Sequence, residues 1–477
     1  MLLRLPLLLV AGQAAAATAA LVASCADPAD CTHDLQHAIL RAHWPAGPGA
    51  LHIPQPRGAR TWITRPLFIN VSNLQVTFAP GVVLEAKAHE FHGIFDSLLT
   101  VAPWSRSDHT GPTFPNVTNI SLVGYGATLR MRKLDYQNHS RDPSMESYSK
   151  SEWRHGLQLS RTKGVAIVGL TIEDTGGDGI ALGASAMFVE DTRVTDCILA
   201  NNHRQGMSVG VSTNLLVERT RFVNTSGTPP QGGVDLEPDR ATTKLSNITF
   251  RDCVADGNAG HQFQAWLGKF NASTEPVSIR FENCSANGRG LGTSFGTAPA
   301  GFMFGGMSPG LRGSISVLNS SVTKTSGPGA LFRRPTAAAT FNIRFRNTLI
   351  DRVARCTASD HGCAKDTHYL DDFLNFDAAP LSVFMDPGKN DAIAPNAVLG
   401  GISFENCTVI DDQPRPYFLL NATWPDGTET RRLEKVRFVD GTVVAPSKRS
   451  CRAQVSSGGA TELALDPMTC TTNQLNE

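Results

Sequence analysis

Apolar and polar residues alternate strictly in a short unit that recurs through residues 153–266. Alternation with a period of two is typical of a strand with one buried face. The unit returns after 23, 27 and 27 residues, and repetition at roughly 20 to 50 residues predicts the stacked coils of a solenoid. The aligned units are Gly156-Leu-Gln-Leu, Gly179-Ile-Ala-Leu, Gly206-Met-Ser-Val, Gly233-Val-Asp-Leu and Gln262-Phe-Gln-Ala.

Similar strand-like runs extend the repeat in both directions, from Trp62-Ile-Thr to Val436-Arg-Phe-Val. Parallel strands one coil apart need crossovers, and such crossovers favour the right hand. The sequence therefore predicts an all-β chain that forms a right-handed parallel β-helix over residues 61–445. Two polar, aperiodic stretches interrupt it: 132–153 is predicted to cross the coil face and 355–397 to be an insertion between coils.

Residues 25–60 are predicted to form an N-terminal cap. Leu35, Ala38 and Ile39 fall on one face of a short helix that has Asp30 or Thr32 as its N-cap. A short amphipathic helix at this place would cover the apolar residues that the first coil leaves exposed.

Residues 1–24 have the features of a secretory signal peptide, with one early arginine, a short apolar core and small residues before Cys25. No later segment is long and apolar enough to span a membrane. The formal net charge is zero and no basic block stands out, which argues against a nucleic-acid partner. We expect a secreted, extracellular monomer that is glycosylated at some of its Asn-x-Ser/Thr sequons, among them Asn119 and Asn247.

The ten cysteines are of two kinds. Three pairs at short separations suit disulfides in an oxidising compartment, and the last of them would pin residues 446–477 as a C-terminal cap or tail. The other four recur at one position of the repeat and predict a buried ladder of thiols. The predicted pairs are Cys25/Cys31, Cys356/Cys363 and Cys451/Cys470, and the predicted ladder is Cys197, Cys253, Cys284 and Cys407.

Stacking the units converts sequence neighbours into columns on the outward face. Small residues lie there beside charged and amide side chains, which suits an extended polar polymer, a polysaccharide, better than a merely solvated sheet. Two tryptophans, Trp153 and Trp266, are candidates to stack on sugar rings. The other candidate substrate-binding residues are Arg154, His155, Gln158, Gln205, Asp239, Arg240, His261 and Gln264.

Asp178 and Asp235 are the leading catalytic candidates. They lie two coils apart, an axial offset of about 9–10 Å, and inverting glycosidases hold their acid and base about 6.5–9.5 Å apart. Hydrolysis with one aspartate as general acid and the other as general base is the leading hypothesis, and Glu237 is able to replace Asp235. An aspartate between glycines also commonly serves only to fix a turn.

Two other interpretations of the same face stay open. His203 and Arg204, with Arg154 and Arg240, suit a uronate lyase or C5-epimerase, in which a base removes a proton and arginine neutralises a carboxylate. A non-catalytic polysaccharide-binding protein needs only the groove. No cofactor is required by any of these hypotheses, although Asp178, Asp235, Glu237 and Asp239 are also candidate Ca²⁺ ligands.

Several segments resemble the pectin-lyase-like superfamily of secreted right-handed β-helices. They include Gly124-Tyr-Gly-Ala-Thr-Leu, Glu152-Trp-Arg-His, Gly176-Gly-Asp-Gly-Ile and Asn202-His-Arg-Gln-Gly. The resemblance implies the fold and action on a polysaccharide. The paired aspartates, the Gly-His-Gly and the Arg-Ile-Lys segments of polygalacturonase-type hydrolases are missing, which argues against a simple polygalacturonase.

Overall fold

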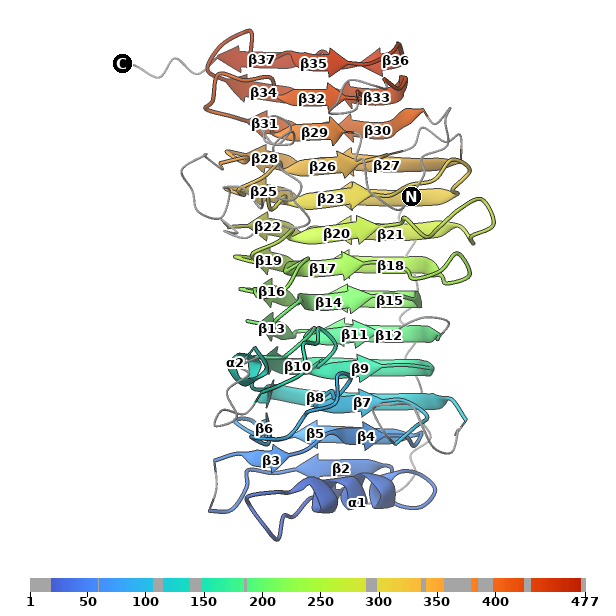
Figure 1. The fold of residues 1–477 in the computed structure, drawn as a ribbon, viewed down its shortest axis with the longest axis vertical. Helices are drawn as coiled ribbons and strands as arrows, with labels where there is room; N and C mark the ends of the chain where they lie inside the picture. The colour runs from blue at the N-terminus through green and yellow to red at the C-terminus, as the bar shows by residue number, and fades with distance from the viewer. Residues whose placement is uncertain are drawn as a thin grey trace, which may run out of the picture.

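The chain forms a long stack of coils, capped at its N-terminal end by helix α1 (Figure 1). This computed structural model describes residues 19–58, 60–105, 115–137, 147–183, 187–288, 298–335, 340–355, 379–384, 398–423 and 430–472. Within these residues two parallel sheets run the length of the stack, one of 25 strands and one of 12. Every pairing between named strands is parallel and joins neighbouring coils, so the predicted right-handed parallel β-helix is confirmed.

The 12-stranded sheet, called sheet B, carries the predicted repeat units in the predicted register. Ala181 pairs with Gln158 on one side and with Ser208 on the other, and Ser208 pairs in turn with Asp235. Its strands are β4 (Leu67–Ile69), β7 (Leu99–Val101), β9 (Leu157–Leu159), β11 (Ile180–Leu182), β14 (Gln205–Val209), β17 (Gly232–Leu236), β20 (Phe263–Trp266), β23 (Phe302–Gly305), β26 (Ala330–Arg333), β29 (Leu381–Phe384), β32 (Phe418–Asn421) and β35 (Ala453–Ser456).

The larger sheet, sheet A, bends to form the two other faces of the coils. The long strands β8 (Val117–Arg130) and β10 (Thr162–Glu173) run across both faces. One face holds β1 (Leu21–Val22), β2 (Ala50–Ile53), β5 (Leu74–Phe78), β12 (Val189–Thr195), β15 (Ser212–Glu218), β18 (Leu245–Arg251), β21 (Val277–Glu282), β24 (Gly313–Leu318), β27 (Phe341–Arg346), β30 (Leu399–Glu405), β33 (Leu433–Val439) and β36 (Ala460–Ala464). The other holds β3 (Trp62–Thr64), β6 (Val83–Ala86), β13 (Ile198–Ala200), β16 (Arg221–Val223), β19 (Val254–Asp256), β22 (Ser285–Asn287), β25 (Ser321–Thr323), β28 (Leu349–Asp351), β31 (Thr408–Ile410), β34 (Thr442–Ala445) and β37 (Thr469–Thr472).

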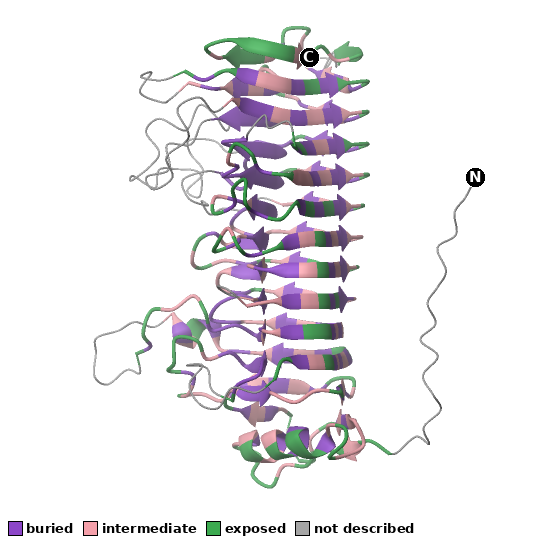
Figure 2. Cartoon of the chain, turned by 90° about the vertical axis from the view of Figure 1, so that its right-hand side faces the viewer, coloured by how far each residue is buried: buried purple, intermediate pink, exposed green. Residues whose placement is uncertain are grey.

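The interior is a continuous apolar column in which equivalent residues of successive coils stack. Phe250 stacks on Phe281 with ring centroids 5.2 Å apart, and Phe345 stacks on Phe404 at 4.8 Å. Offset stacking of this kind adds to the free energy gained by burial. Figure 2 shows the burial alternating along the strands, as the period of two requires. The four cysteines predicted as a thiol ladder, Cys197, Cys253, Cys284 and Cys407, are all buried and unbridged. They occupy one column, but only Cys253 and Cys284 lie in adjacent coils, because hydroxyl residues fill the positions between the others.

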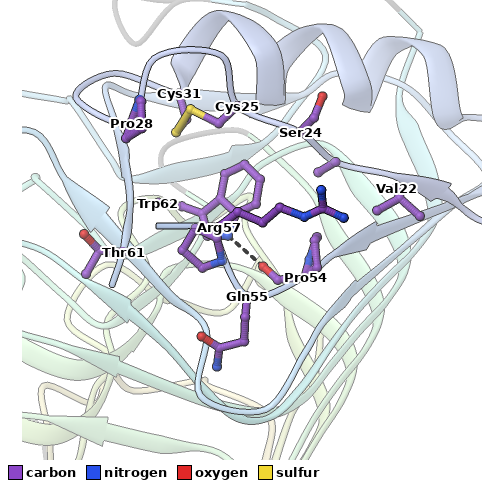
Figure 3. Close-up of a pocket in the computed structure, with 12 residues that line it drawn as sticks. Val22, Ser24, Cys25, Pro28, Cys31, Pro54, Gln55, Arg57, Thr61 and Trp62 are labelled. Carbon is purple, nitrogen blue, oxygen red and sulfur yellow. Dashed lines mark hydrogen bonds between the residues drawn. A yellow bond between two sulfur atoms is a disulfide. The ribbon is translucent and has the colours of Figure 1, made fainter. Parts of the chain in front are cut away.

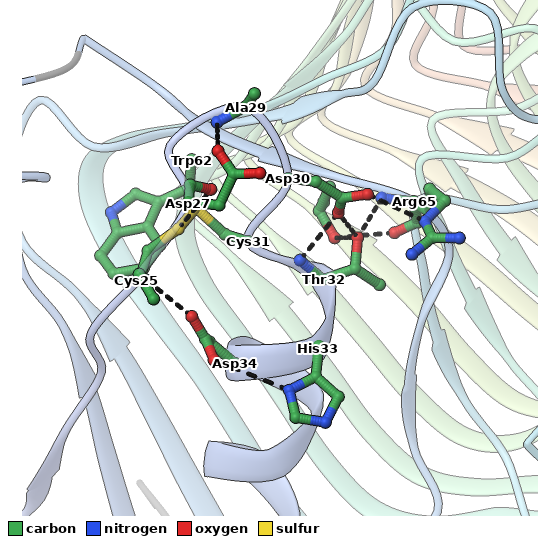
Figure 4. The surroundings of a disulfide bond; sticks show 12 residues. Cys25, Asp27, Ala29, Asp30, Cys31, Thr32, His33, Asp34, Trp62 and Arg65 are labelled. Carbon is green, nitrogen blue, oxygen red and sulfur yellow. Dashed lines mark hydrogen bonds and ion pairs between the residues drawn. A yellow bond between two sulfur atoms is a disulfide. The ribbon is translucent and has the colours of Figure 1, made fainter.

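The N-terminal cap is the helix α1 (Thr32–Ala42), whose buried face includes Leu35, Ala38 and Ile39 as predicted. Its N-cap is Cys31, not Asp30 or Thr32, although the Asp30 carboxylate accepts a hydrogen bond from the backbone N–H of Thr32. The disulfide between Cys25 and Cys31 ties the preceding turn to the helix (Figure 4). Beside it lies a cavity of about 460 Å³ at the end of the stack, lined by residues that include Arg57 and Trp62 (Figure 3).

Some of the predicted segment boundaries differ from the observed coils, and others agree with them. The segment 355–397 contains β29, which continues sheet B, and the residues predicted as a C-terminal tail form a further coil from β35, β36 and β37. The Cys451–Cys470 disulfide is present, whereas Cys356 and Cys363 lie outside the described residues. A short helix, α2 (Lys133–Tyr136), lies in the predicted excursion. In the described part of the chain no helix is long and apolar enough to cross a membrane.

Two of the predicted glycosylation sequons belong to ladders of side-chain amides. The Asn119 amide nitrogen donates to Asn73, and the Asn247 amide nitrogen donates to Asn214, each at 2.9 Å across one coil. All four asparagines have positive φ, which asparagine tolerates because its short side chain hydrogen-bonds locally.

Candidate functional site

Strand β14 lies between the two catalytic candidates and bonds to both of them. Asp178 precedes β11, Asp235 lies in β17, and both strands pair with β14. From β14, the Ser208 hydroxyl donates to Asp178 Oδ2 at 2.6 Å and the Gln205 amide donates to Asp235 Oδ2 at 2.9 Å. Through these two hydrogen bonds β14 links Asp178 and Asp235 into one cluster.

The carboxyl group of Asp235 is buried beneath the outward surface, with 1% of the residue exposed. The Gln264 amide donates to its second oxygen, Oδ1, at 3.0 Å. Burial raises the pKa of Asp235 well above its usual range, and the charge of the neighbouring Glu237 raises it further. The protonated form of Asp235 is therefore favoured more than that of an exposed aspartate.

Glu237 lies two residues beyond Asp235 on the same outward side, and its side chain is 40% exposed. Its pKa is raised by burial, while the Arg204 charge and a hydrogen bond with Asp235 lower it. Both carboxyl groups thus favour their protonated forms more than exposed carboxyl groups do, and Glu237 is the one that reaches solvent, as a general acid must.

Arg204 lies at the centre of the carboxyl groups. Its guanidinium faces Glu152 at 3.4 Å, Asp178 at 3.6 Å and Glu237 at 3.7 Å, with 17% of the side chain exposed. Burial lowers the pKa of Arg204, but the surrounding carboxylates more than reverse this and raise it, so the charge is permanent. Arg204 closes over Asp178 and holds the cluster together.

Two of the three histidines predicted for this face, His155 and His203, have different surroundings. His155 Nδ1 accepts the backbone N–H of Asp178 at 3.0 Å, so the ring proton is on Nε2. Burial lowers the pKa of His155, and the neutral ring positions the backbone of Asp178, while its predicted contact with substrate stays a prediction. His203 Nδ1 lies 2.8 Å from the Gln137 amide nitrogen and beside Gly227, at the turn before β14.

Arg154 was predicted to bind substrate, but the structure places it in the interior, where it is fully buried. Its guanidinium donates to the backbone carbonyls of Phe91, His92 and Ser149 at 2.8–3.2 Å. It also lies 5.7 Å and 5.6 Å from the ring centroids of Tyr136 and Tyr148. Arg154 fastens two surface loops to the stack, and it has no surface from which to reach a polysaccharide.

His261 and Trp266, which were also predicted to bind substrate, pack against neighbouring side chains. His261 is fully buried, and burial followed by the charge of Arg333 lowers its pKa to about 3. Trp266 packs beneath two guanidinium groups, with Arg333 at 5.4 Å and Arg334 at 5.0 Å from its ring. Trp266 is only partly buried, so its stacking on a sugar ring stays a prediction.

The remaining predicted residues lie around the cluster. Trp153 is 39% exposed and stacks on Phe95, whose ring centroid is 5.2 Å away. Gln158 lies in β9, where its side-chain oxygen accepts from Ser97 at 3.4 Å. Asp239 and Arg240 are exposed in the loop after β17.

Two residues of the cluster were not among the predicted site residues. Ser208 was noted only as a small residue of the outward column, because the repeat says nothing about which neighbour a hydroxyl will meet. Glu152 lies just before β9 in the excursion, where no periodicity fixes its place, and only its position beside Trp153 and Arg154 in the sequence pointed to it. The described residues contain no group of three or more histidine, cysteine, aspartate or glutamate side chains placed to hold a metal ion.

Comparisons with known proteins place this geometry in a known architecture. A family model described as a right-handed β-helix region matches residues 139–286. The A-module of the mannuronan C-5 epimerase AlgE6 of Azotobacter vinelandii superposes with a TM-score of 0.56 at 12% identity, covering 91% of this chain and 95% of that one. The AlgE4 A-module of the same organism gives 0.54 at 13%, covering 91% and 96%.

A search of curated proteins finds no matching sequence. At 12–13% identity the structural likeness defines the fold and not the reaction. The parallel sheets, the matched family region and the two superpositions together identify the fold of the chain as a right-handed parallel β-helix.

Proposed function

We propose that this protein is a carbohydrate-active enzyme, a glycoside hydrolase that cleaves a polysaccharide bound along the outward face of sheet B. The observation that carries the proposal is the cluster of three carboxyl groups around Arg204 and β14: Asp235 and Glu237, whose pKa values burial raises, and the separate carboxyl group of Asp178. Hydrolysis of a glycosidic bond needs one carboxyl group as general acid and a second as general base or nucleophile.

In this mechanism Glu237 presents the proton to the leaving oxygen, because its side chain is the exposed member of the pair. Asp235, held by Gln205 and Gln264, replenishes that proton from below. Asp178 activates the attacking water. The two strands that carry the acid and the base are two spacings apart, about 9–10 Å, which is compatible with an inverting reaction.

Substrate binding must also displace Arg204 from Asp178. Its ion pairs there are longer than hydrogen bonds, at 3.4–3.7 Å, so this movement breaks no tight contact. Once displaced, the guanidinium stays beside the reaction centre, where it is able to stabilise developing negative charge.

The test is a screen of the purified protein against neutral, cationic and acidic polysaccharides, with products analysed by mass. A gain of one water per cleaved bond supports hydrolysis. Asp178→Asn, Asp235→Asn and Glu237→Gln should each lower kcat by at least about a hundredfold, the usual contribution of general acid–base catalysis. Glu190→Gln on sheet A, where Glu190 is also 40% exposed, is the matched control and should leave kcat unchanged.

The same screen separates the alternatives. A uronate lyase would release an unsaturated product that absorbs in the near ultraviolet, and a C5-epimerase would change sugar configuration without cleavage. Binding without any product would identify a non-catalytic polysaccharide-binding protein. Full activity of both Asp178→Asn and Asp235→Asn would refute the assigned roles.

A further inference from the structure

The first strand of sheet A lies inside the segment that the sequence predicts as a signal peptide. Leu21 pairs with Leu51 and Val22 with His52, so β1 lies parallel to β2, and the backbone N–H of Ala23 donates to the His52 carbonyl at 2.8 Å. The opposite edge of β2 pairs with β5. β1 therefore covers the edge of β2 at the end of the stack, and an unpaired strand edge is a liability that folded proteins cover.

The same segment is also packed into the end of the stack. Ala23 is 5% exposed and belongs to the continuous core, and Leu21 packs against that core. Residues 22–24 form part of the wall of the cavity of about 460 Å³ beside Trp62, which is 2% exposed (Figure 3). A terminus is held in place when it is paired in a sheet and packed in this way, so residues 21–24 are a structural part of the cap.

The sequence offers a processing site on each side of β1. Small residues at the first and third positions before the cut are the mark of a signal-peptide cleavage site. The boundary predicted from the sequence follows Ser24, and the triplet Ala17-Thr18-Ala19 is the last Ala-x-Ala match ahead of β1. Cleavage after Ser24 would remove β1 and the buried Ala23, whereas cleavage after Ala19 leaves both in place.

We propose that signal peptidase cleaves the bond between Ala19 and Ala20, so that residues 20–24 stay in the mature protein as the first part of its N-terminal cap. Hydrolysis adds one water to this peptide bond and leaves a carboxyl group on Ala19 and an α-amino group on Ala20. Both residues are exposed and precede β1, so the new charge stays in water and no strand pairing is lost. The proposal rests on the predicted secretion of the chain and is independent of the proposed activity.

The test is secretory expression of the full chain in yeast, with the N-terminal peptide of the purified protein identified by tandem mass spectrometry. We expect this peptide to begin at Ala20. A protein that begins at Cys25, or one that keeps Met1, would overturn the proposal.

Two matched variants separate the candidate bonds, because each places a leucine where cleavage requires a small residue. Ala19→Leu should abolish the N-terminus at Ala20. Ser24→Leu should leave that N-terminus unchanged, and its variant is expected to fold because Ser24 is exposed. The reverse pattern would place the cut after Ser24 and overturn the proposal.

The structural role of the retained segment is tested by deleting residues 20–24 from the precursor, so that the same cut produces a protein that begins at Cys25. This protein should have a lower Tm than the wild type, because β2 loses its edge partner and the core loses Ala23. Val22→Thr is the control: Val22 is 60% exposed, and threonine suits a strand, so the Tm should stay the same. A deletion protein with the Tm of the wild type would overturn the assignment of these residues to the cap.

Discussion

Replacing Arg154 by methionine tests whether this residue binds substrate, as the sequence predicted, or fastens two surface loops to the stack, as the structure shows. Methionine keeps a similar length and apolar stem but removes every donor. If Arg154 bound substrate, the variant would fold normally and raise KM. If it fastens the surface loops to the stack, as its contacts show, the variant loses stability first.

The size of the loss follows from the contacts. Four hydrogen bonds to three backbone carbonyls disappear, at about 1–3 kcal/mol for each carbonyl left buried and unpaired. Two ring contacts add about 0.5–1 kcal/mol each. Because the loops lie at the surface, water will reach some of the carbonyls, so we expect a net cost of about 3–5 kcal/mol. Lysine, with one point charge in place of the planar fork, should cost about half as much.

Equilibrium unfolding in guanidinium chloride measures this cost, with the native state followed by circular dichroism. Activity, assayed on the folded fraction, should fall as well, because Arg154 also fixes the neighbouring Glu152 and Trp153. A stability within about 0.5 kcal/mol of the wild type, with KM alone increased, would refute the structural role.

Three further predictions concern the cluster and its surroundings. Since the pKa of Asp235 is raised by burial and by Glu237, the folded state holds that proton more tightly than the unfolded chain, and stability is lost as pH rises above about 4. Asp235→Asn should therefore gain thermal stability relative to the wild type as pH rises, and parallel melting curves across pH would contradict this. Burial lowers the pKa of Lys133 from 10.5 to about 8, so the unfolded chain binds this proton more tightly than the folded one. Between pH 8 and 10.5 the free energy of unfolding of the wild type should therefore rise by up to about 3 kcal/mol relative to Lys133→Met, as measured by denaturant unfolding. A difference that stays constant with pH would show that Lys133 is solvated. Trp153→Ala should raise KM with little change in Tm, whereas Trp266→Ala should cost about 3 kcal/mol because Arg333 and Arg334 pack on its ring; the opposite pattern would restore Trp266 as a sugar platform.

The alternation in each unit and the recurring glycine were sufficient to predict the coils, the register of sheet B and the burial of the four repeat cysteines. Each is a local or nearest-neighbour property: period-two alternation specifies which side is buried, and identical units bury their apolar faces only by stacking in register. The same stacking correctly predicted that Asp178, Asp235, Glu237 and Gln264 would lie on one face. Sequence reasoning failed at β29, because a single four-residue strand between two long irregular segments carries too little periodicity to be recognised.

The alternation along the chain specifies which side chains leave the coils, whereas the segments that fold over those side chains set which of them stay accessible. Arg154 and Phe91 are 63 residues apart, and the loop that buries Arg154 has no repeat to predict its path. The same holds for Glu152, which reaches Arg204 from outside the periodic strands, and for Arg333, which covers Trp266 from two coils away. Alternation fixes the direction of a side chain within a strand, whereas its exposure and charge depend on distant segments that fold over it.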